Sequence, residues 1–158
     1  MHSVGCFQLY NMRGLVRFGL LNSRLHQAWV RTVSGQLETR IRYAVELCYN
    51  TFPVSQLSAT QVATIEENAM EIIAAREAHP GKTLEWLYDP NTMPTDLLQA
   101  HRNLDDTVER VFIGRPFKND IERLEHLFKL YALMTKKQAS EPAKKTTAAK
   151  ALAAQGAV

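Results

Sequence analysis

The first recognisable element of the chain is an amphipathic helix, which we expect over residues 20–34. Its apolar side chains recur at spacings of three and four, which places them on one stripe of a helix. They are Leu21, Leu25, Ala28, Trp29 and Val33. Gly35 follows as the expected helix stop. The opposite face carries side chains that can hydrogen-bond to phosphate oxygens or base edges, namely Ser23, Arg24, Gln27, Arg31 and Ser34. Solvation alone would also account for that face.

Residues 45–52 mix β-branched and aromatic side chains and end at Pro53. This composition favours a short strand or extended stretch that runs into a turn. The aromatic residues of the region are Tyr43, Tyr49 and Phe52. We expect them first as core residues, with stacking on nucleic-acid bases as the alternative.

Three longer helices are predicted after this segment, and the first has clear ends. Ser58 and Gln61 have the spacing of a capping box, so the helix should begin at about residue 59. It should end near residues 79–81, where a proline and a glycine follow a histidine. A short helix at residues 84–88, capped by Thr83, should fill the gap between the longer helices.

The second long helix is expected over residues 94–112, and the third begins near Asn119 and runs to about residue 134. His101 falls in the apolar stripe of the second helix. A partly buried histidine with a hydrogen-bond partner is the expectation there, because no second metal-type residue occurs at a matching spacing.

The expected fold is therefore mainly α. Three helices joined by connections of modest length predict a small antiparallel helical bundle, which a helix and a short strand precede. From residue 136 onward the composition collapses to Lys, Ala and Thr, so residues 136–158 are expected to form a disordered basic tail. That tail would either touch DNA non-specifically or serve only as a solubilising end.

The charge of the chain is unevenly distributed, although the net charge is only +3. Residues 1–55 carry six basic residues, all arginine, against Glu38 and Glu46. Residues 56–135 carry more acidic than basic side chains. An arginine-only basic segment fits nucleic-acid contact, because guanidinium binds phosphate or guanine through two parallel hydrogen bonds. Six scattered surface arginines are the equally simple alternative.

The sequence lacks the patterns of an independent enzyme. It has no Gly-rich loop between a strand and a helix, no Gly-x-Ser-x-Gly elbow and no metal-ligand spacing. We therefore expect no catalytic residue, no metal site and no cofactor in this chain. Cys6 and Cys48 are too few for a disulfide framework, which favours a reducing cytoplasm. Neither a signal peptide nor a membrane span is expected.

Four strings, in this order, carry a resemblance to a known family. They are FGLLNSRLHQAWVR, RYAVELCYNTFP, LYDPNTMPTDLLQAH and FKNDIERLEHLFKLY. The chain resembles the C-terminal part of the MmeI-like DNA methyltransferases, which are single-chain type IIL restriction-modification enzymes. The resemblance assigns residues 13–55 to the end of an incomplete α/β target-recognition domain. It assigns residues 56–135 to a helical C-terminal domain and leaves residues 1–12 unmatched.

The resemblance implies a function in DNA modification. In that family an upstream domain transfers a methyl group from S-adenosylmethionine to adenine N6, and neither its cofactor loop nor its Asn-Pro-Pro-aromatic motif occurs here. The expected partners are therefore double-stranded DNA and, if it is separately encoded, the catalytic half of the methyltransferase. The expected DNA-contacting residues are Arg17, Arg24, Arg31, Arg40, Arg42, Tyr43 and Asn50. The alternatives are a protein-protein interaction module and a nonfunctional remnant of a truncated gene.

Overall fold

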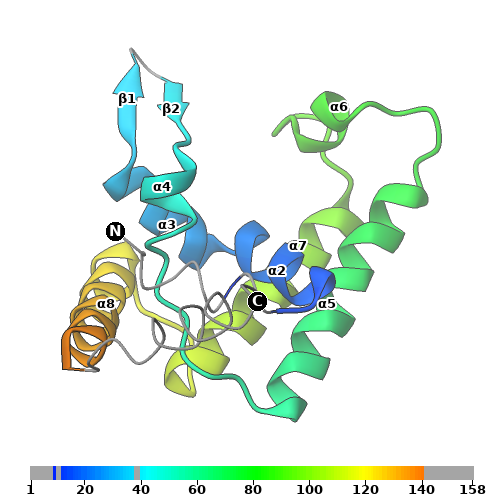
Figure 1. Cartoon of the computed structure of the whole chain (residues 1–158). Coiled ribbons are helices and arrows are strands. Elements are labelled where there is room, and N and C mark those ends of the chain that lie inside the picture. Colours follow the sequence, from blue (N-terminus) through cyan, green and yellow to red (C-terminus); the bar gives the residue numbers. More distant parts are fainter. Residues whose placement is uncertain (1–8, 10–11, 38–39, 141–158) are drawn as a thin grey trace, which may run out of the picture.

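The computed structural model of the chain describes residue 9 and residues 12–37 and 40–140. Two helices at its start, α2 (Gly14–Asn22) and α3 (Arg24–Val33), lead into a hairpin of strands β1 (Gly35–Leu37) and β2 (Arg40–Arg42). The short helix α4 (Val45–Cys48) follows the hairpin. The chain then forms α5 (Ala59–Glu77), α6 (Leu84–Tyr88), α7 (Thr95–Ile113) and α8 (Asp120–Ser140). The prediction of a mainly helical fold is confirmed (Figure 1).

The centre of the molecule is the packing of α2 against α5 and of α5 against α7. Helix α2 can approach closely because Gly19 has no side chain. A Cβ atom at Gly19 would lie 2.8 Å from Cγ2 of Ile65 on α5 and 3.3 Å from Cδ1 of Leu104 on α7. Leu20, Ile65 and Leu104 are all fully buried. One hydrophobic core therefore joins the first helix to the later bundle.

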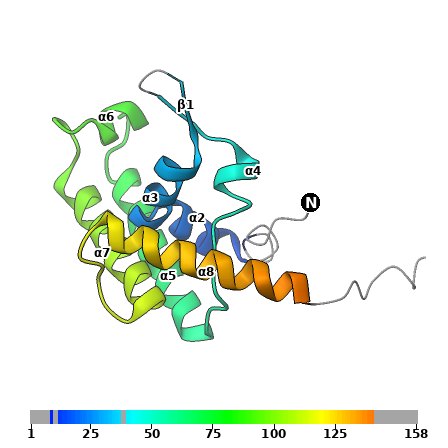
Figure 2. The same cartoon turned by 90° about the vertical axis from the view of Figure 1, so that its left-hand side faces the viewer.

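Helix α8 packs on the other side of this core, against α3. Trp29 of α3 is 2% exposed, and its ring centroid lies 5.1 Å from that of Phe128 and 5.9 Å from that of Tyr131. Figure 2 shows α8 crossing the molecule, with its C-terminal end extending beyond the other helices. These ring contacts hold the middle of α8 against α3.

The helix ends follow the predicted capping residues. Ser58 and Gln61 form the expected capping box, in which each side chain accepts a hydrogen bond from the other residue's backbone N–H. Thr83 caps α6, and Asn119 accepts a hydrogen bond from the Glu122 N–H at the start of α8. Gly114 ends α7 in the left-handed conformation, at φ 78°. Short polar side chains therefore set the helix starts that the sequence indicated.

His101 is half-buried on α7, as predicted, and has a hydrogen-bond partner. Its Nε2 lies 2.8 Å from the Tyr88 hydroxyl, which also accepts a hydrogen bond of 2.8 Å from Arg76 Nε. Arg76 and Tyr88 lie on α5 and α6. This three-residue contact ties α6 to the two long helices, and Leu87 of α6 is buried beside it.

Three expectations about individual helices and strands need correction. The single helix over residues 20–34 is two helices, because Ser23 ends α2 and caps α3. The expected strand at residues 45–52 is wrong, since Val45–Cys48 is helical and a turn follows. Residues 136–140, which the composition assigned to the tail, belong to α8. Residues 141–158 lie outside the described part of the chain.

Each correction has a physical reason. The fully buried Ser23 hydroxyl donates to the Leu20 carbonyl at 2.7 Å and accepts from the His26 N–H at 3.3 Å, so it serves both helix ends rather than a polar face. Trp29 Nε1 donates to Thr51 Oγ1 at 3.1 Å, which fastens the α4 turn to α3 and overrides the weak strand propensity. Lys, Gln and Ala propagate a helix that has already formed, which extends α8.

Candidate nucleic-acid interface

The hairpin β1–β2 projects from the helical body and carries part of the expected basic surface (Figure 1). Its strands pair antiparallel, with Gly35 opposite Arg42 and Leu37 opposite Arg40. The side chain of Arg42 is exposed at the foot of the hairpin. Arg40 belongs to β2 by its backbone, whereas its side chain lies outside what the structure describes.

Arg31 is the second exposed cation close to the hairpin. It lies in the last turn of α3, and the helix leads directly into β1. Among the described residues, no ion pair engages Arg31 or Arg42. Both side chains are exposed, and a planar guanidinium suits phosphate because it can form two parallel hydrogen bonds.

Arg24 and Arg17 occupy different surroundings from this pair. The backbone N–H of Arg24 donates to Asp105 Oδ1 at 2.6 Å, and its guanidinium lies 3.5 Å from Asp105 Oδ2. These contacts tie the start of α3 to α7. Arg17 is half-buried on α2, and helix α3 separates it from the hairpin along the chain. Hence, of the five arginines expected to act together, Arg31 and Arg42 have exposed side chains without a described ion pair next to the hairpin.

Tyr43 follows β2 and is 47% exposed. Its hydroxyl lies 3.2 Å from Nε2 of His26, which is only 3% exposed. Burial lowers the pKa of His26 to about 4, so its imidazole is neutral near pH 7. Burial is also the main cause that raises the pKa of Tyr43, so the pair consists of two neutral groups near neutral pH.

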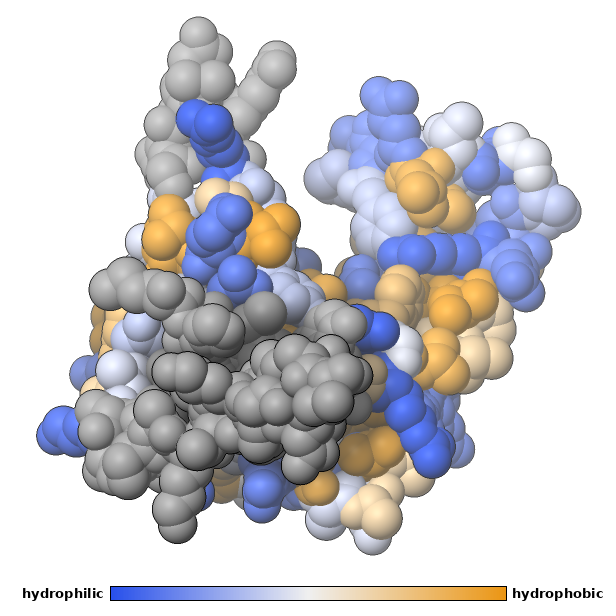
Figure 3. Space-filling model, in the orientation of Figure 1, coloured by the Kyte–Doolittle hydropathy of each residue, from blue (hydrophilic) through white to orange (hydrophobic). Residues whose placement is uncertain are grey.

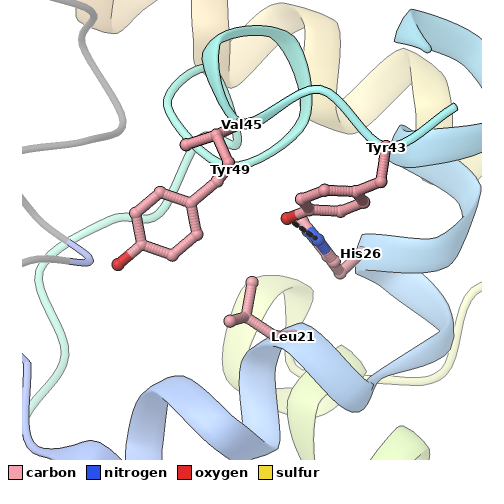
Figure 4. Close-up of a pocket in the computed structure, with 5 residues that line it drawn as sticks. All are labelled: Leu21, His26, Tyr43, Val45 and Tyr49. Atoms are coloured by element: carbon pink, nitrogen blue, oxygen red, sulfur yellow. Dashed lines mark hydrogen bonds between the residues drawn. The ribbon is translucent and has the colours of Figure 1, made fainter.

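An open hollow of 520 Å³ lies beside this pair. It is lined by Leu21, His26, Tyr43, Val45 and Tyr49, which come from α2, α3 and the segment around α4 (Figure 4). Figure 4 shows the Tyr43 and Tyr49 rings on two sides of the hollow, with Leu21 across from them. The lining contains no charged side chain at neutral pH, which makes the hollow a poor site for a phosphate group.

Asn50 and Phe52 belong to the turn after α4. The backbone N–H of Asn50 donates to the Val45 carbonyl at 2.9 Å, and the residue is half-buried. Phe52 is fully buried, with its ring centroid 4.7 Å from that of His26 in an edge-on arrangement. The expectation of core packing is thus confirmed for Phe52. Tyr43 remains the exposed aromatic residue of this region.

The sequence reasoning did not single out His26, although a signal was present. His26 precedes Trp29 by three residues and Val33 by seven, which is the spacing of a buried helical stripe.

In the described ranges, no group of three or more His, Cys, Asp or Glu side chains is placed to hold a metal ion. None of the described helices is long and apolar enough to cross a membrane.

Comparison with known proteins assigns this arrangement to a family. Residues 2–56 match the family described as the MmeI target recognition domain, and residues 57–139 match the one described as the MmeI C-terminal domain. The chain belongs to the MmeI-like type IIL restriction-modification methyltransferases. The resemblance found in the four strings is thereby confirmed. The matched region begins at residue 2, so it includes most of the segment that the strings left unmatched.

Two MmeI-like relatives show how much of the family this chain represents. DNA methyltransferase A of Bacillus subtilis (strain 168) is 49% identical over 119 residues, which are 75% of this chain and 13% of that protein. The solved structure of the type IIL enzyme MmeI in complex with DNA is 44% identical, with a TM-score of 0.74. That match covers 78% of this chain and 17% of the MmeI chain. The chain therefore spans less than a fifth of the length of either relative.

Proposed function

We propose that this chain is the DNA-contacting and structural C-terminal module of a site-specific DNA adenine methyltransferase of the restriction-modification type. One observation carries the proposal. The region that matches the target recognition domain contains the projecting hairpin, which includes the exposed Arg42 and follows the exposed Arg31 in the chain. The solved MmeI structure that resembles this chain was determined in complex with DNA.

In this role the arginines contact the sugar-phosphate backbone and position the hairpin on the duplex. Base specificity is weak for the chain alone, because a short hairpin presents few side chains to base edges. The buried contacts among α2, α5 and α7 hold the hairpin on a rigid base.

Methyl transfer takes place elsewhere in the enzyme. The described residues include no Gly-rich loop between a strand and a helix, so they do not fit an S-adenosylmethionine site. The cofactor would bind to a separate catalytic domain, either on the same polypeptide or on a separately encoded half.

The proposal is tested by measuring DNA binding at several salt concentrations. The chain is titrated with duplex DNA, alone and together with DNA methyltransferase A lacking the segment that matches this chain. We expect salt-dependent affinity in at least one of the two settings, because phosphate contacts release counterions. Absence of binding in both settings would refute the proposal.

A further inference from the structure

The hairpin is an incomplete sheet in the described structure. Strands β1 and β2 pair only with each other, so each has one edge without a partner strand among the described residues. A two-stranded hairpin is at best marginally stable in water, and an open edge is a template for another strand. The hairpin is therefore suited to belong to a larger sheet.

Hydrophobic side chains gather at the foot of this hairpin. We call Leu21, Tyr43, Val45, Leu47 and Tyr49 the α4 patch. Val45 is 54% exposed, Leu47 is 49% exposed and Tyr43 is 47% exposed. Leu21 and Tyr49 are half-buried and line the 520 Å³ hollow together with Tyr43 and Val45. Figure 3 shows hydrophobic surface over α4, below the hairpin. Several apolar side chains gathered around a hollow mark an interaction site, whereas single exposed apolar residues do not.

The charge of the α4 patch disfavours DNA as its direct partner. The patch contains no Lys or Arg, and the exposed Glu46 lies between Val45 and Leu47. A carboxylate at this position repels phosphate. The basic side chains Arg31 and Arg42 lie outside the patch, so the hairpin region has a cationic part and a separate apolar part.

We propose that the α4 patch is the docking surface for the rest of the target-recognition domain. The occupant is an apolar polypeptide segment that places a side chain in the hollow and adds a strand to an open edge of the hairpin. This inference rests on the proposed function, since it names the partner of the same module. Two observations support the inference. The chain spans only 13% of one relative and 17% of the other. In addition, its hairpin and its apolar patch both lack partners among the described residues.

The test measures complex formation in the absence of DNA. The probe is DNA methyltransferase A of Bacillus subtilis from which the segment matching this chain has been removed. Isothermal titration of this probe with the full chain should show binding. Val45→Asp combined with Leu47→Asp should weaken it at least tenfold, because two carboxylates would enter an apolar contact.

A matched control uses two exposed apolar residues on another surface. Ile121 is 69% exposed and Leu133 is 64% exposed, and both lie on α8. Ile121→Asp combined with Leu133→Asp makes the same chemical change outside the α4 patch, so the affinity should stay within twofold of the wild-type value. Thermal unfolding of both double variants verifies that the fold is intact.

A second measurement does not depend on the truncated probe folding alone. This chain replaces the matching segment of DNA methyltransferase A, and cysteine is introduced as Val45→Cys or Leu133→Cys. Thiol labelling of Val45→Cys should be fast in the isolated chain and at least tenfold slower in the chimera. Labelling of Leu133→Cys should change less.

Several results would overturn the inference. They are equal labelling of Val45→Cys in both settings, full binding by the patch variant, or equal loss of binding in the α8 variant. Dimerisation of the isolated chain that the patch substitutions abolish would identify a second copy as the occupant instead. Loss of DNA binding with an intact complex would refute only the proposed function, so the two failures are distinguishable.

Discussion

Glu109 of α7 and Arg123 of α8 form an ion pair that is almost completely buried. Glu109 Oε1 lies 2.6 Å from Arg123 Nη2 and accepts a hydrogen bond from Arg123 Nε at 2.8 Å. Its other oxygen accepts the Phe117 N–H at 2.7 Å. The ion pair therefore joins the two helices, and its carboxylate also accepts a backbone hydrogen bond from the turn between them.

Removal of one member of this pair should be strongly destabilising. We expect Glu109→Ala to lower the free energy of unfolding by up to about 3–5 kcal/mol, because the buried guanidinium keeps only the exposed Asp120 as an ion-pair partner and the Phe117 N–H loses its acceptor. Urea denaturation followed by circular dichroism measures the loss. The double variant Glu109→Leu with Arg123→Met should recover part of it, since no buried charge remains. A single variant with wild-type stability would contradict this account.

Gly19→Ala tests the close approach of α2 to α5. The new Cβ would lie 2.8 Å from Ile65 Cγ2, so side chains must move. We expect a loss of about 1–3 kcal/mol from overpacking, partly offset by about 1 kcal/mol of better helix propensity. Gly14→Ala on the same helix is the control, because nothing lies within 4 Å of its Cβ position. The two variants should therefore differ in thermal midpoint, with Gly14→Ala the more stable.

The pKa of His26 predicts a dependence of stability on pH. The imidazole titrates near 6.5 in the unfolded chain and at about 4 in the fold. Because the unfolded chain binds the proton more readily, the free energy of unfolding should be highest above pH 6.5 and fall as the pH decreases toward 4. At pH 5 the loss from His26 is about 2 kcal/mol.

The variant His26→Gln isolates this contribution in urea denaturation curves recorded at pH 7 and pH 5. Burial also lowers the pKa of His101 and His126, so the variant should retain part of the dependence. If the variant and the wild type lost the same free energy of unfolding between pH 7 and pH 5, His26 would not be the group responsible.

Arg31→Ala combined with Arg42→Ala should weaken DNA binding, because fewer phosphate charges are then neutralised. The slope of log affinity against log salt should become shallower by about one for each arginine that binds a phosphate in the wild type. Arg102→Ala is the matched control, because Arg102 is exposed on α7 in the region that matches the C-terminal domain. If the Arg102 variant lost as much affinity as the double variant, the binding surface would lie elsewhere.

Tyr88→Phe should loosen α6 without unfolding the bundle. The hydroxyl accepts from Arg76 and contacts His101, and its removal should cost about 1 kcal/mol. Hydrogen exchange of the α6 amides should accelerate relative to those of α5. Tyr131→Phe is the control, since the Tyr131 hydroxyl has no hydrogen bond to the described residues. Unchanged exchange in α6 would mean that the Tyr88 hydroxyl does not hold this helix in place.

The helical bundle was predictable because its signals are local. Ser58, Thr83 and Asn119 mark helix starts by side-chain chemistry that acts within three residues. The periodic apolar positions of α5, α7 and α8 then select the buried faces. His101 could be placed for the same reason, because its position in a stripe implies burial and a partner.

The hairpin region was less predictable because its structure depends on distant contacts. Ser23 looked like part of a polar helix face, yet its hydroxyl serves two helix ends at once. The strand propensity of residues 45–52 yields to the contact between Trp29 and Thr51, 22 residues apart. Nothing in the sequence indicated that Arg24 would bind Asp105, which lies 81 residues away.

The shared core of α2, α5 and α7 has a practical consequence for chimeric enzymes. Gly19 lies in the region that matches the target recognition domain, whereas Ile65 and Leu104 lie in the region that matches the C-terminal domain. A junction at residue 56 would exchange one side of this contact and leave the other unmatched. A junction before α2 would transfer the hairpin and its supporting helices as a single exchangeable unit.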